Sequence, residues 1–276
     1  MLQIQDISFG YRKGANVLDH FSLDFNAGGI YGLLGRNGTG KSTLLYLIMG
    51  LLHPHDGHIL YNGKDTRLRH PEALQDMFIV PEEYDLPSVM LDDYVKTIRQ
   101  FYPRFSDEIL DNCLAGFDMP RETNLSALSM GQKKKIYMCI ALAANTRLLV
   151  MDEPTNGLDI PSKSQFRKVV KSGMTEDKTI IISTHQVRDV ELLLDRVVVI
   201  ERNRVLLRAS MQDILEHYRF CEVDRDALPA NRLYEEPSPR GYSVLVPRME
   251  GEEATPVNLE HLFNFLLSNP TTTLKI

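Results

Sequence analysis

The chain contains 276 residues, of which 43% are apolar and 25% charged, and its formal net charge is −6. A chain of this length and composition can bury a sizeable core, and it accommodates one large domain with a smaller appendage. The acidic balance argues against a general nucleic-acid binder. The sequence contains no apolar stretch long enough to span a bilayer and no N-terminal signal-peptide pattern. We therefore expect a cytoplasmic protein, and a membrane pore that works with it would have to be formed by another chain.

Residues 2–9 and 21–25 alternate apolar and polar side chains. This period of two predicts half-buried antiparallel strands that flank a parallel core. Residues 30–34 form an apolar run that predicts a buried strand, and residues 43–48 follow as an apolar helix. A strand, a loop and a helix are therefore expected in this order around residues 35–42.

The loop between that strand and helix matches the phosphate-binding pattern G-x-x-x-x-G-K-[ST]. Backbone N–H groups of such a loop point at phosphate oxygens, and the following helix adds the positive end of its dipole. We expect Lys41 to reach the β- and γ-phosphates and the Ser42 hydroxyl to bind Mg²⁺. The alternative, a Gly-rich turn that binds nothing, is disfavoured by the Lys41-Ser42 pair. The predicted ATP-binding residues of this segment are Gly35, Asn37, Gly38, Thr39, Gly40, Lys41, Ser42 and Thr43.

A second buried strand, residues 148–151, ends in Asp152 and Glu153. In a parallel sheet these carboxylates emerge at the carboxyl edge, where ligands bind. We expect Asp152 to contact Mg²⁺, usually through water, and Glu153 to act as the base that polarises an attacking water. The alternative is an ordinary strand end that faces solvent.

Upstream of that strand, residues 128–132 read Leu-Ser-Met-Gly-Gln and precede a helix that runs through residues 133–138. The Ser129 hydroxyl and the Gly131 N–H at the start of this helix form an anion site. The alternative is a serine N-cap that opens an amphipathic helix. The three lysines 133–135 are interpreted as a solvated face in preference to a source of positive potential near phosphates.

Downstream, Ser183-Thr184-His185 follows a strand at residues 179–182, and Asn203 lies in the turn of a hairpin formed by residues 197–207. A helix near residues 211–218 is expected to end the main domain. Prolines are frequent in the remaining tail, where residues 242–246 predict a strand and residues 259–267 an amphipathic helix. We consider a packing role for this small α/β appendage and a dimerisation or regulatory role equally open.

The order of these motifs resembles that of the ATP-binding cassette (ABC) family of ATPases, the motor subunits of ABC transporters. The resemblance extends from about residue 2 to residue 208. Residues 128–132 are similar to the family signature LSGGQ, with Met130 in place of the first glycine. Residues 156–159 resemble the loop after the acid pair, and residues 183–185 resemble the segment that carries the switch histidine. Each string is short, but their joint order is specific.

The resemblance implies an α/β fold, namely the P-loop NTPase fold of ABC ATPases. This fold has a mostly parallel core sheet, an antiparallel β subdomain, a helical subdomain and, here, a small C-terminal α/β extension. We expect the ATPase domain to span residues 1–218, with the helical subdomain at about 86–135, and the extension to span residues 219–276. A groove between the helical subdomain and the core is expected to receive a cytoplasmic helix of a membrane partner.

The resemblance also assigns roles to individual residues. Tyr11 is expected to stack on adenine, and His185 to reach the γ-phosphate and hold the water and Glu153 in line. Glu82 stands where the family usually has a glutamine that touches Mg²⁺. The expected metal ligands are Ser42, Glu82 and Asp152. Residues expected to contact the nucleotide of a second subunit are Ser129, Gly131, Gln132 and Asp159.

In functional terms, the resemblance implies an ATP- and Mg²⁺-dependent ATPase subunit of an ABC transporter, of bacterial exporter type. Its head-to-tail dimer closes on ATP and drives substrate movement by a separate permease at the inner face of the membrane. A homodimer is the simpler assumption, and a heterodimer is allowed. The alternative is a soluble ABC-type ATPase that remodels or regulates a cytosolic complex.

Overall fold

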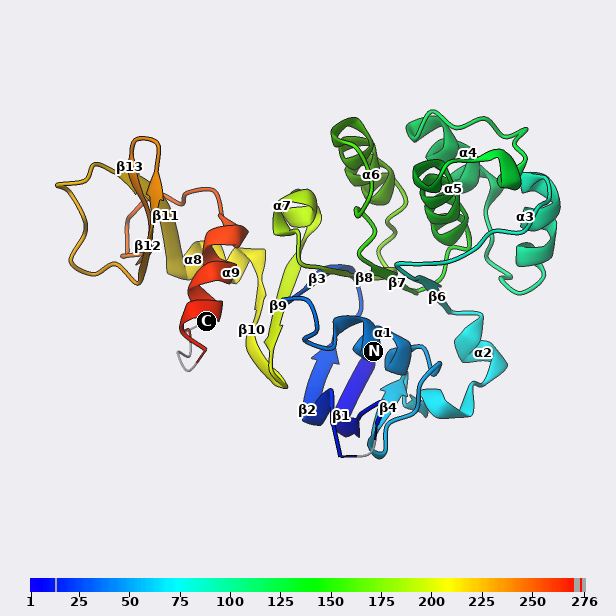
Figure 1. Cartoon of the computed structure of the whole chain (residues 1–276), viewed down its shortest axis with the longest axis horizontal. Helices are drawn as coiled ribbons and strands as arrows, with labels where there is room; N and C mark the ends of the chain where they lie inside the picture. The colour runs from blue at the N-terminus through cyan, green and yellow to red at the C-terminus, as the bar shows by residue number, and fades with distance from the viewer. Residues whose placement is uncertain (13, 271–273, 275–276) are drawn as a thin grey trace.

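A six-stranded sheet forms the centre of the computed structural model, which describes residues 1–12, 14–270 and 274 (Figure 1). The strand order is β10-β9-β3-β8-β7-β6, and every neighbouring pair from β9 to β6 is parallel. Only β10, at one edge, is antiparallel to its neighbour. The strands are β3 (Gly29–Leu34), β6 (Met77–Val80), β7 (Leu148–Asp152), β8 (Thr179–Thr184), β9 (Arg196–Glu201) and β10 (Arg204–Ser210).

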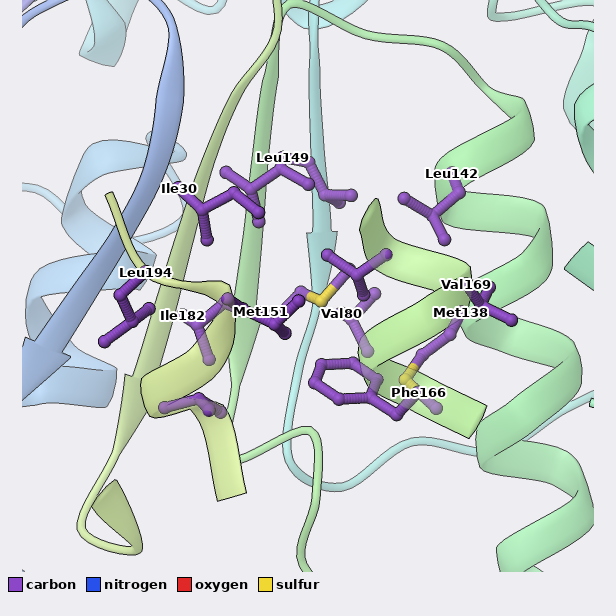
Figure 2. Packing of buried hydrophobic residues seen from close by; sticks show 14 of the residues in the cluster. Ile30, Val80, Met138, Leu142, Leu149, Met151, Phe166, Val169, Ile182 and Leu194 are labelled. Carbon is purple, nitrogen blue, oxygen red and sulfur yellow. The ribbon is translucent and has the colours of Figure 1, made fainter. Parts of the chain in front are cut away.

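The parallel strands of this sheet are buried on both faces, and alternate residues of each strand point to opposite sides. Ile30 belongs to a hydrophobic cluster on one side of the sheet that also includes residues of helices α5 (Met130–Ala143) and α6 (Ile160–Ser172), as Figure 2 shows. Tyr31 and its equivalents on the other strands pack on the opposite side with helix α1 (Lys41–Ile48). Burial on both faces explains why the parallel strands are apolar runs without a polar face.

A four-stranded antiparallel sheet in the order β2-β1-β4-β5 covers the α1 side. Its strands are β1 (Leu2–Phe9), β2 (Leu18–Phe25), β4 (Asp56–Tyr61) and β5 (Lys64–Asp65). The short helices η1 (Thr66–Leu68) and α2 (Pro71–Leu74) lead from it to β6. The two predicted N-terminal strands are confirmed, and β2 begins three residues earlier than expected.

The helical part of the chain packs against the other side of the core sheet (Figure 1). Arg121 joins its helices by ion pairs with Asp92, Asp107 and Asp111. Its elements are α3 (Leu91–Arg99), α4 (Asp107–Gly116), η2 (Leu125–Ala127) and α5.

The C-terminal part is a three-stranded antiparallel sheet with two helices, attached through the β9–β10 hairpin. Asn203 adopts the left-handed conformation expected in that hairpin, with φ of 66°. Its elements are α8 (Met211–His217), β11 (Tyr218–Val223), β12 (Tyr234–Ser238), β13 (Gly241–Pro247) and α9 (Leu259–Ser268). Sequence analysis predicted α8, β13 and α9 but neither β11 nor β12. Helix α9 packs on α7 (Val187–Val190), which η3 (Glu191–Leu193) follows.

Within the described residues, no helix combines the length and the apolar character that crossing a bilayer requires.

Candidate functional site

Five parallel strands deliver their carboxyl ends to one edge of the core sheet, which is where ligands bind in such sheets. Leu34 at the end of β3 lies opposite Thr184 at the end of β8, and Asp152 of β7 lies opposite Ser183. A cleft of about 430 Å³ opens at this edge. Its lining residues are Tyr11, Val17, Asn37, Gly38, Gly40, Lys41, Ser42, Thr43, Glu82, Glu153, Asn156 and His185.

The loop between β3 and α1 has the backbone of a phosphate cradle. Gly38 and Gly40 have φ of 80° and 94°, which only glycine adopts without strain. A Cβ at Gly35 would lie 2.7 Å from Thr39 Oγ1 and 2.8 Å from the Ile200 carbonyl oxygen, so the loop has no room for a side chain there. The predicted residues thus form a tight, glycine-dependent turn at a helix N-terminus, which fits a bound phosphate.

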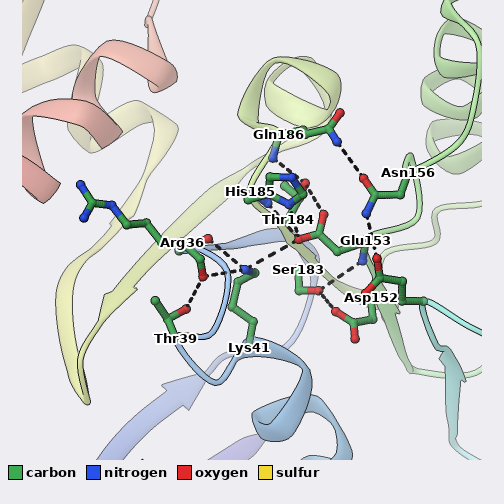
Figure 3. Close-up of polar contacts among 12 residues, drawn as sticks. Arg36, Thr39, Lys41, Asp152, Glu153, Asn156, Ser183, Thr184, His185 and Gln186 are labelled. Atoms are coloured by element: carbon green, nitrogen blue, oxygen red, sulfur yellow. Dashed lines mark hydrogen bonds and ion pairs between the residues drawn. The ribbon is translucent and has the colours of Figure 1, made fainter. Parts of the chain in front are cut away.

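Lys41 is held inside this loop. Its side chain is only 6% exposed, and Nζ donates to the carbonyl oxygens of Gly35 at 2.9 Å and Arg36 at 3.2 Å (Figure 3). Burial lowers the pKa of Lys41, while the nearby carboxylates Glu153 and Asp152 act in the opposite direction. The lysine is therefore placed as a cation whose position is fixed before phosphate arrives.

Glu153 is a buried carboxylate whose oxygens are all engaged (Figure 3). Oε2 accepts from Thr184 Oγ1 at 3.0 Å, and Oε1 accepts from the His185 backbone N–H at 3.1 Å. His185 Nδ1 lies 2.8 Å from the same Oε1, and Lys41 Nζ lies 3.7 Å from it. Glu153 was predicted from its strand end and His185 from the family resemblance, and the two residues are in direct contact, which gives the carboxylate a fixed orientation.

The predicted metal ligands fit Mg²⁺ by their chemistry, because they offer one hydroxyl and two carboxylates. Asp152 is 1% exposed and accepts a hydrogen bond from the Ser183 hydroxyl. Burial raises the pKa of Asp152, and hydrogen bonds from Ser183 and Ser42 oppose this shift. Glu82 is exposed in the cleft, where Oε1 accepts from Asn156 Nδ2 at 2.9 Å.

Tyr11 lies in a bend of the chain two residues after strand β1, and it also lines the cleft. It is 63% exposed, its hydroxyl is 3.2 Å from Thr43 Oγ1, and its ring packs edge-to-face on Phe9 at 5.1 Å between centroids. The contacts fix an aromatic ring at the cleft while leaving most of its surface free. This arrangement suits stacking on a base.

The four remaining predicted residues do not line this cleft. Ser129, Gly131, Gln132 and Asp159 line a separate depression of about 280 Å³. Ser129 Oγ accepts from the Gln132 N–H while Gln132 Oε1 accepts from the Ser129 N–H, which is a complete capping box at the start of α5. Asp159 caps α6 through the Ser162 N–H. The serine N-cap considered from sequence is therefore present, and it adjoins a second helix N-terminus.

Comparison with known proteins identifies the family. A protein-family model described as ABC transporter matches residues 18–156, just over half of the chain. The chain belongs to this family. It is 27% identical to the ABC transporter ATP-binding protein YtrB of Bacillus subtilis (strain 168), over 95% of this chain and 97% of the relative. It is 30% identical to the Nod factor export ATP-binding protein I of Rhizobium etli, over 80% of this chain and 72% of that protein.

Among solved structures, an ATP-binding subunit of an ABC transporter is similar with a TM-score of 0.68 at 25% identity. The similarity covers 78% of this chain and 91% of the other. The predicted fold class is confirmed, and the chain is an ABC ATPase that binds ATP.

The ABC ATPase departs from the sequence-based interpretation at the three lysines of α5. Lys134 is buried, at 8% exposure, and its Nζ donates to the carbonyl oxygens of Glu153 at 3.0 Å and Asn156 at 2.9 Å. Lys135 bonds to Gln165 Oε1 at 3.0 Å. The interpretation as a solvated face is therefore wrong for Lys134, because the helix turns this side chain into the protein.

Sequence reasoning also missed the polar residues that support the cleft. Asn156 links Glu82 to Gln186, whose Nε2 donates to Asn156 Oδ1 at 2.8 Å. Thr184 and Ser183 each hold one carboxylate of the acid pair. The available signal was their position at or shortly after the carboxyl ends of β7 and β8, which had already been assigned to one sheet edge.

Proposed function

We propose that this ABC ATPase drives an ABC transporter by closing a head-to-tail dimer on ATP and Mg²⁺. The observation that carries the proposal is the separation of the two predicted half-sites, which share no lining residue. The depression at Ser129 and Asp159 joins two helix N-termini, which favour an anion, yet it lies outside the chain's own cleft. In the proposed dimer, the γ-phosphate of the ATP bound by a second subunit lies in this depression, so each ATP is held between the two subunits. Because one chain carries both, a homodimer suffices, and a heterodimer remains the alternative assembly.

In the proposed hydrolysis, Lys41 and the loop N–H groups bind the phosphates. Glu153 takes a proton from the water that attacks the γ-phosphorus, and the bond from that phosphorus to the bridging oxygen breaks to release ADP and phosphate. His185 orients the Glu153 carboxylate through its Nδ1 contact and bonds the γ-phosphate. Ser42, Asp152 and Glu82 are the residues that would hold Mg²⁺, which supplies positive charge to phosphate oxygens when bound. ATP shifts the dimer equilibrium because it makes contacts in the closed state that the open state lacks.

A groove of about 460 Å³ supports the proposed coupling to a permease. It lies between the helical part and the core, and its surface is mostly apolar, with Phe101 62% and Leu51 49% exposed. We propose that a cytoplasmic helix of a membrane permease occupies it, which would place the ATPase at the inner face of the membrane. Similarity to an export ATP-binding protein favours export. The groove residues include Met49, Leu51, Leu74, Met77, Ile98 and Phe101.

The first test is the solution mass of Glu153→Gln by light scattering, with and without ATP and Mg²⁺. We expect an ATP-dependent dimer. The matched control adds Gly131→Asp, since a Cβ at Gly131 meets only the Gly157 carbonyl oxygen at 3.9 Å and the fold has room for it. The added carboxylate repels a γ-phosphate at the second depression, so the double variant should stay monomeric. A dimer that forms equally in both proteins contradicts the proposed half-site.

The second test separates transport from the soluble alternative. We expect the tagged chain, expressed in its own host, to fractionate with membranes together with a multi-spanning protein. Phe101→Glu, which places a charge in the apolar groove, should release it without changing its ATP affinity. A chain that stays in the soluble fraction and binds a cytosolic complex instead would favour the remodelling ATPase.

A further inference from the structure

Lys134 places a buried cation in contact with the loop 153–156, which carries the candidate base Glu153. Its two hydrogen bonds both go to main-chain oxygens, those of Glu153 and Asn156. Among the residues that the structure describes, no carboxylate forms an ion pair with Lys134 Nζ. Burial lowers the pKa of this lysine, while the more distant carboxylates of Glu82, Glu153 and Asp152 act in the opposite direction. A buried charge without a direct ion pair is unfavourable unless hydrogen bonds compensate for the lost water, and here both of these bonds go to the loop 153–156. The contacts therefore point to a role in holding the loop.

The loop that Lys134 holds has a strained start. Glu153 has φ of 43°, in the left-handed region that non-glycine residues rarely adopt. The Asn156 N–H closes the turn by donating to the Glu153 carbonyl oxygen at 3.2 Å. The backbone conformation at Glu153 directs its carboxylate toward Thr184 and His185. A bond that fixes the Glu153 carbonyl therefore also fixes where the carboxylate points.

Lys134 also lies on the helix that forms the second depression. Ser129 caps α5 five residues earlier, and the first turns of the helix form a single rigid element. The ammonium group thus joins the N-terminal turns of α5 to the loop 153–156 of the cleft. Neither of its neighbours does so, because Lys135 bonds Gln165 and Lys133 is half-buried with no side-chain hydrogen bond among the described residues.

We propose that Lys134 is a positioning residue for hydrolysis. It fixes the backbone of Glu153 and links it to helix α5, which begins at the signature segment 128–132. The proposal rests on the proposed role of Glu153 as the base. It predicts that losing the Lys134 ammonium misplaces the carboxylate without removing any group that touches ATP. A displacement of about 1 Å at a reacting group can cost on the order of 10²-fold in rate.

The test compares full-length Lys134→Met, Lys134→Gln and Lys133→Met with the wild type. Steady-state turnover gives kcat and KM, a fluorescent ATP analogue gives affinity, and thermal unfolding reports the fold. We expect kcat to fall about 10- to 100-fold in Lys134→Met while the Kd for the analogue changes by less than about threefold. Lys134→Gln, which keeps N–H donors on a shorter chain, should recover part of kcat. Lys133→Met should stay within about twofold of the wild type.

Two outcomes would overturn the proposal. The first is a kcat for Lys134→Met within about threefold of the wild type, and the second is a loss of affinity as large as the loss of kcat, which indicates general damage to the cleft. If Lys134→Met does not fold, the same criteria apply to Lys134→Gln. Glu153→Gln is measured alongside. If Glu153→Gln retains turnover, the proposed base is wrong, whereas an inactive Glu153→Gln with a fully active Lys134→Met refutes the positioning role alone.

Discussion

Replacing Glu153 by glutamine separates hydrolysis from binding, because the amide fits the same contacts. With its carbonyl oxygen at the Oε1 position, the new side chain still accepts from the two His185 donors. Its NH₂ then faces the Thr184 hydroxyl, which can accept as well as donate. Lys41 keeps its two carbonyl partners. The side chain is therefore held in place, and only its ability to take a proton is lost.

We expect kcat for ATP hydrolysis to fall on the order of 10²- to 10⁴-fold, the range typical of a lost general base. At about 1.36 kcal/mol per tenfold change, the activation barrier rises by about 2.7 to 5.4 kcal/mol. ATP affinity should be kept or increased, because one negative charge leaves the neighbourhood of the phosphates.

Phosphate release under saturating ATP and Mg²⁺ measures kcat, and titration with a fluorescent ATP analogue measures affinity. Glu108→Gln is the matched control, since it makes the same change on the exposed surface of α4 and should behave as the wild type. Turnover that is unchanged in Glu153→Gln would remove this residue from the mechanism. Loss of nucleotide affinity in step with kcat would show that the carboxylate acts in binding and not in the chemical step.

Three further perturbations test other parts of the structure. Tyr11→Ala should weaken ATP binding by about 1 to 3 kcal/mol through lost stacking, and identical titration curves for the two proteins would refute that contact. Gly35→Ala should reduce ATP affinity at least about tenfold, because the new Cβ collides with Thr39 Oγ1 and the Ile200 carbonyl oxygen; normal affinity would show that the loop adjusts freely. Burial lowers the pKa of Lys178 to about 8 from 10.5, so between these pH values the unfolded chain holds a proton that the folded chain releases. The Lys178 contribution to the free energy of unfolding should therefore rise with pH by up to about 1.4 kcal/mol per unit across this window. In Lys178→Met this slope should be missing from urea titrations at pH 8 to 9.5, whereas Lys171→Met, an exposed control, should keep it.

The location of the candidate site followed from sequence because the strands carrying it are parallel. An apolar run followed by polar residues recurs at β3, β7 and β8, and the carboxyl ends of parallel strands meet at one sheet edge. The rule accounts for the closeness of Glu153 and His185, but the role of His185 itself came from the resemblance to the ABC family. Their hydrogen-bond geometry was not predictable, since it depends on the register that places Asp152 opposite Ser183.

The strand β12 escaped prediction because its sequence carries little local signal, whereas β11 was missed although it reads Tyr-Arg-Phe-Cys-Glu-Val, which is rich in strand-forming residues. β12 reads Tyr-Glu-Glu-Pro-Ser, where two acidic residues and a proline oppose strand formation. It forms through pairing with β13, which also pairs with β11 on its other side. β12 is an edge strand, so its proline costs no ladder bond on the open side. Pairing with a distant segment thus overrides local propensity here.

The geometry of an α-helix explains why the interpretation of Lys134 as part of a solvated face was wrong. Consecutive residues of an α-helix point about 100° apart, so three adjacent lysines cannot share one solvated face. Lys134 lies on the same side as Met138 and Ala141, four and seven residues later, and both are buried. The apolar continuation of that side indicates an inward-pointing chain, and inside the fold it finds two carbonyl oxygens. An apolar residue at position 134 would satisfy the pattern but would leave the Asn156 carbonyl oxygen without the donor it has now. The sequence therefore departs from apolar periodicity where the carbonyl oxygens of the loop 153–156 accept hydrogen bonds.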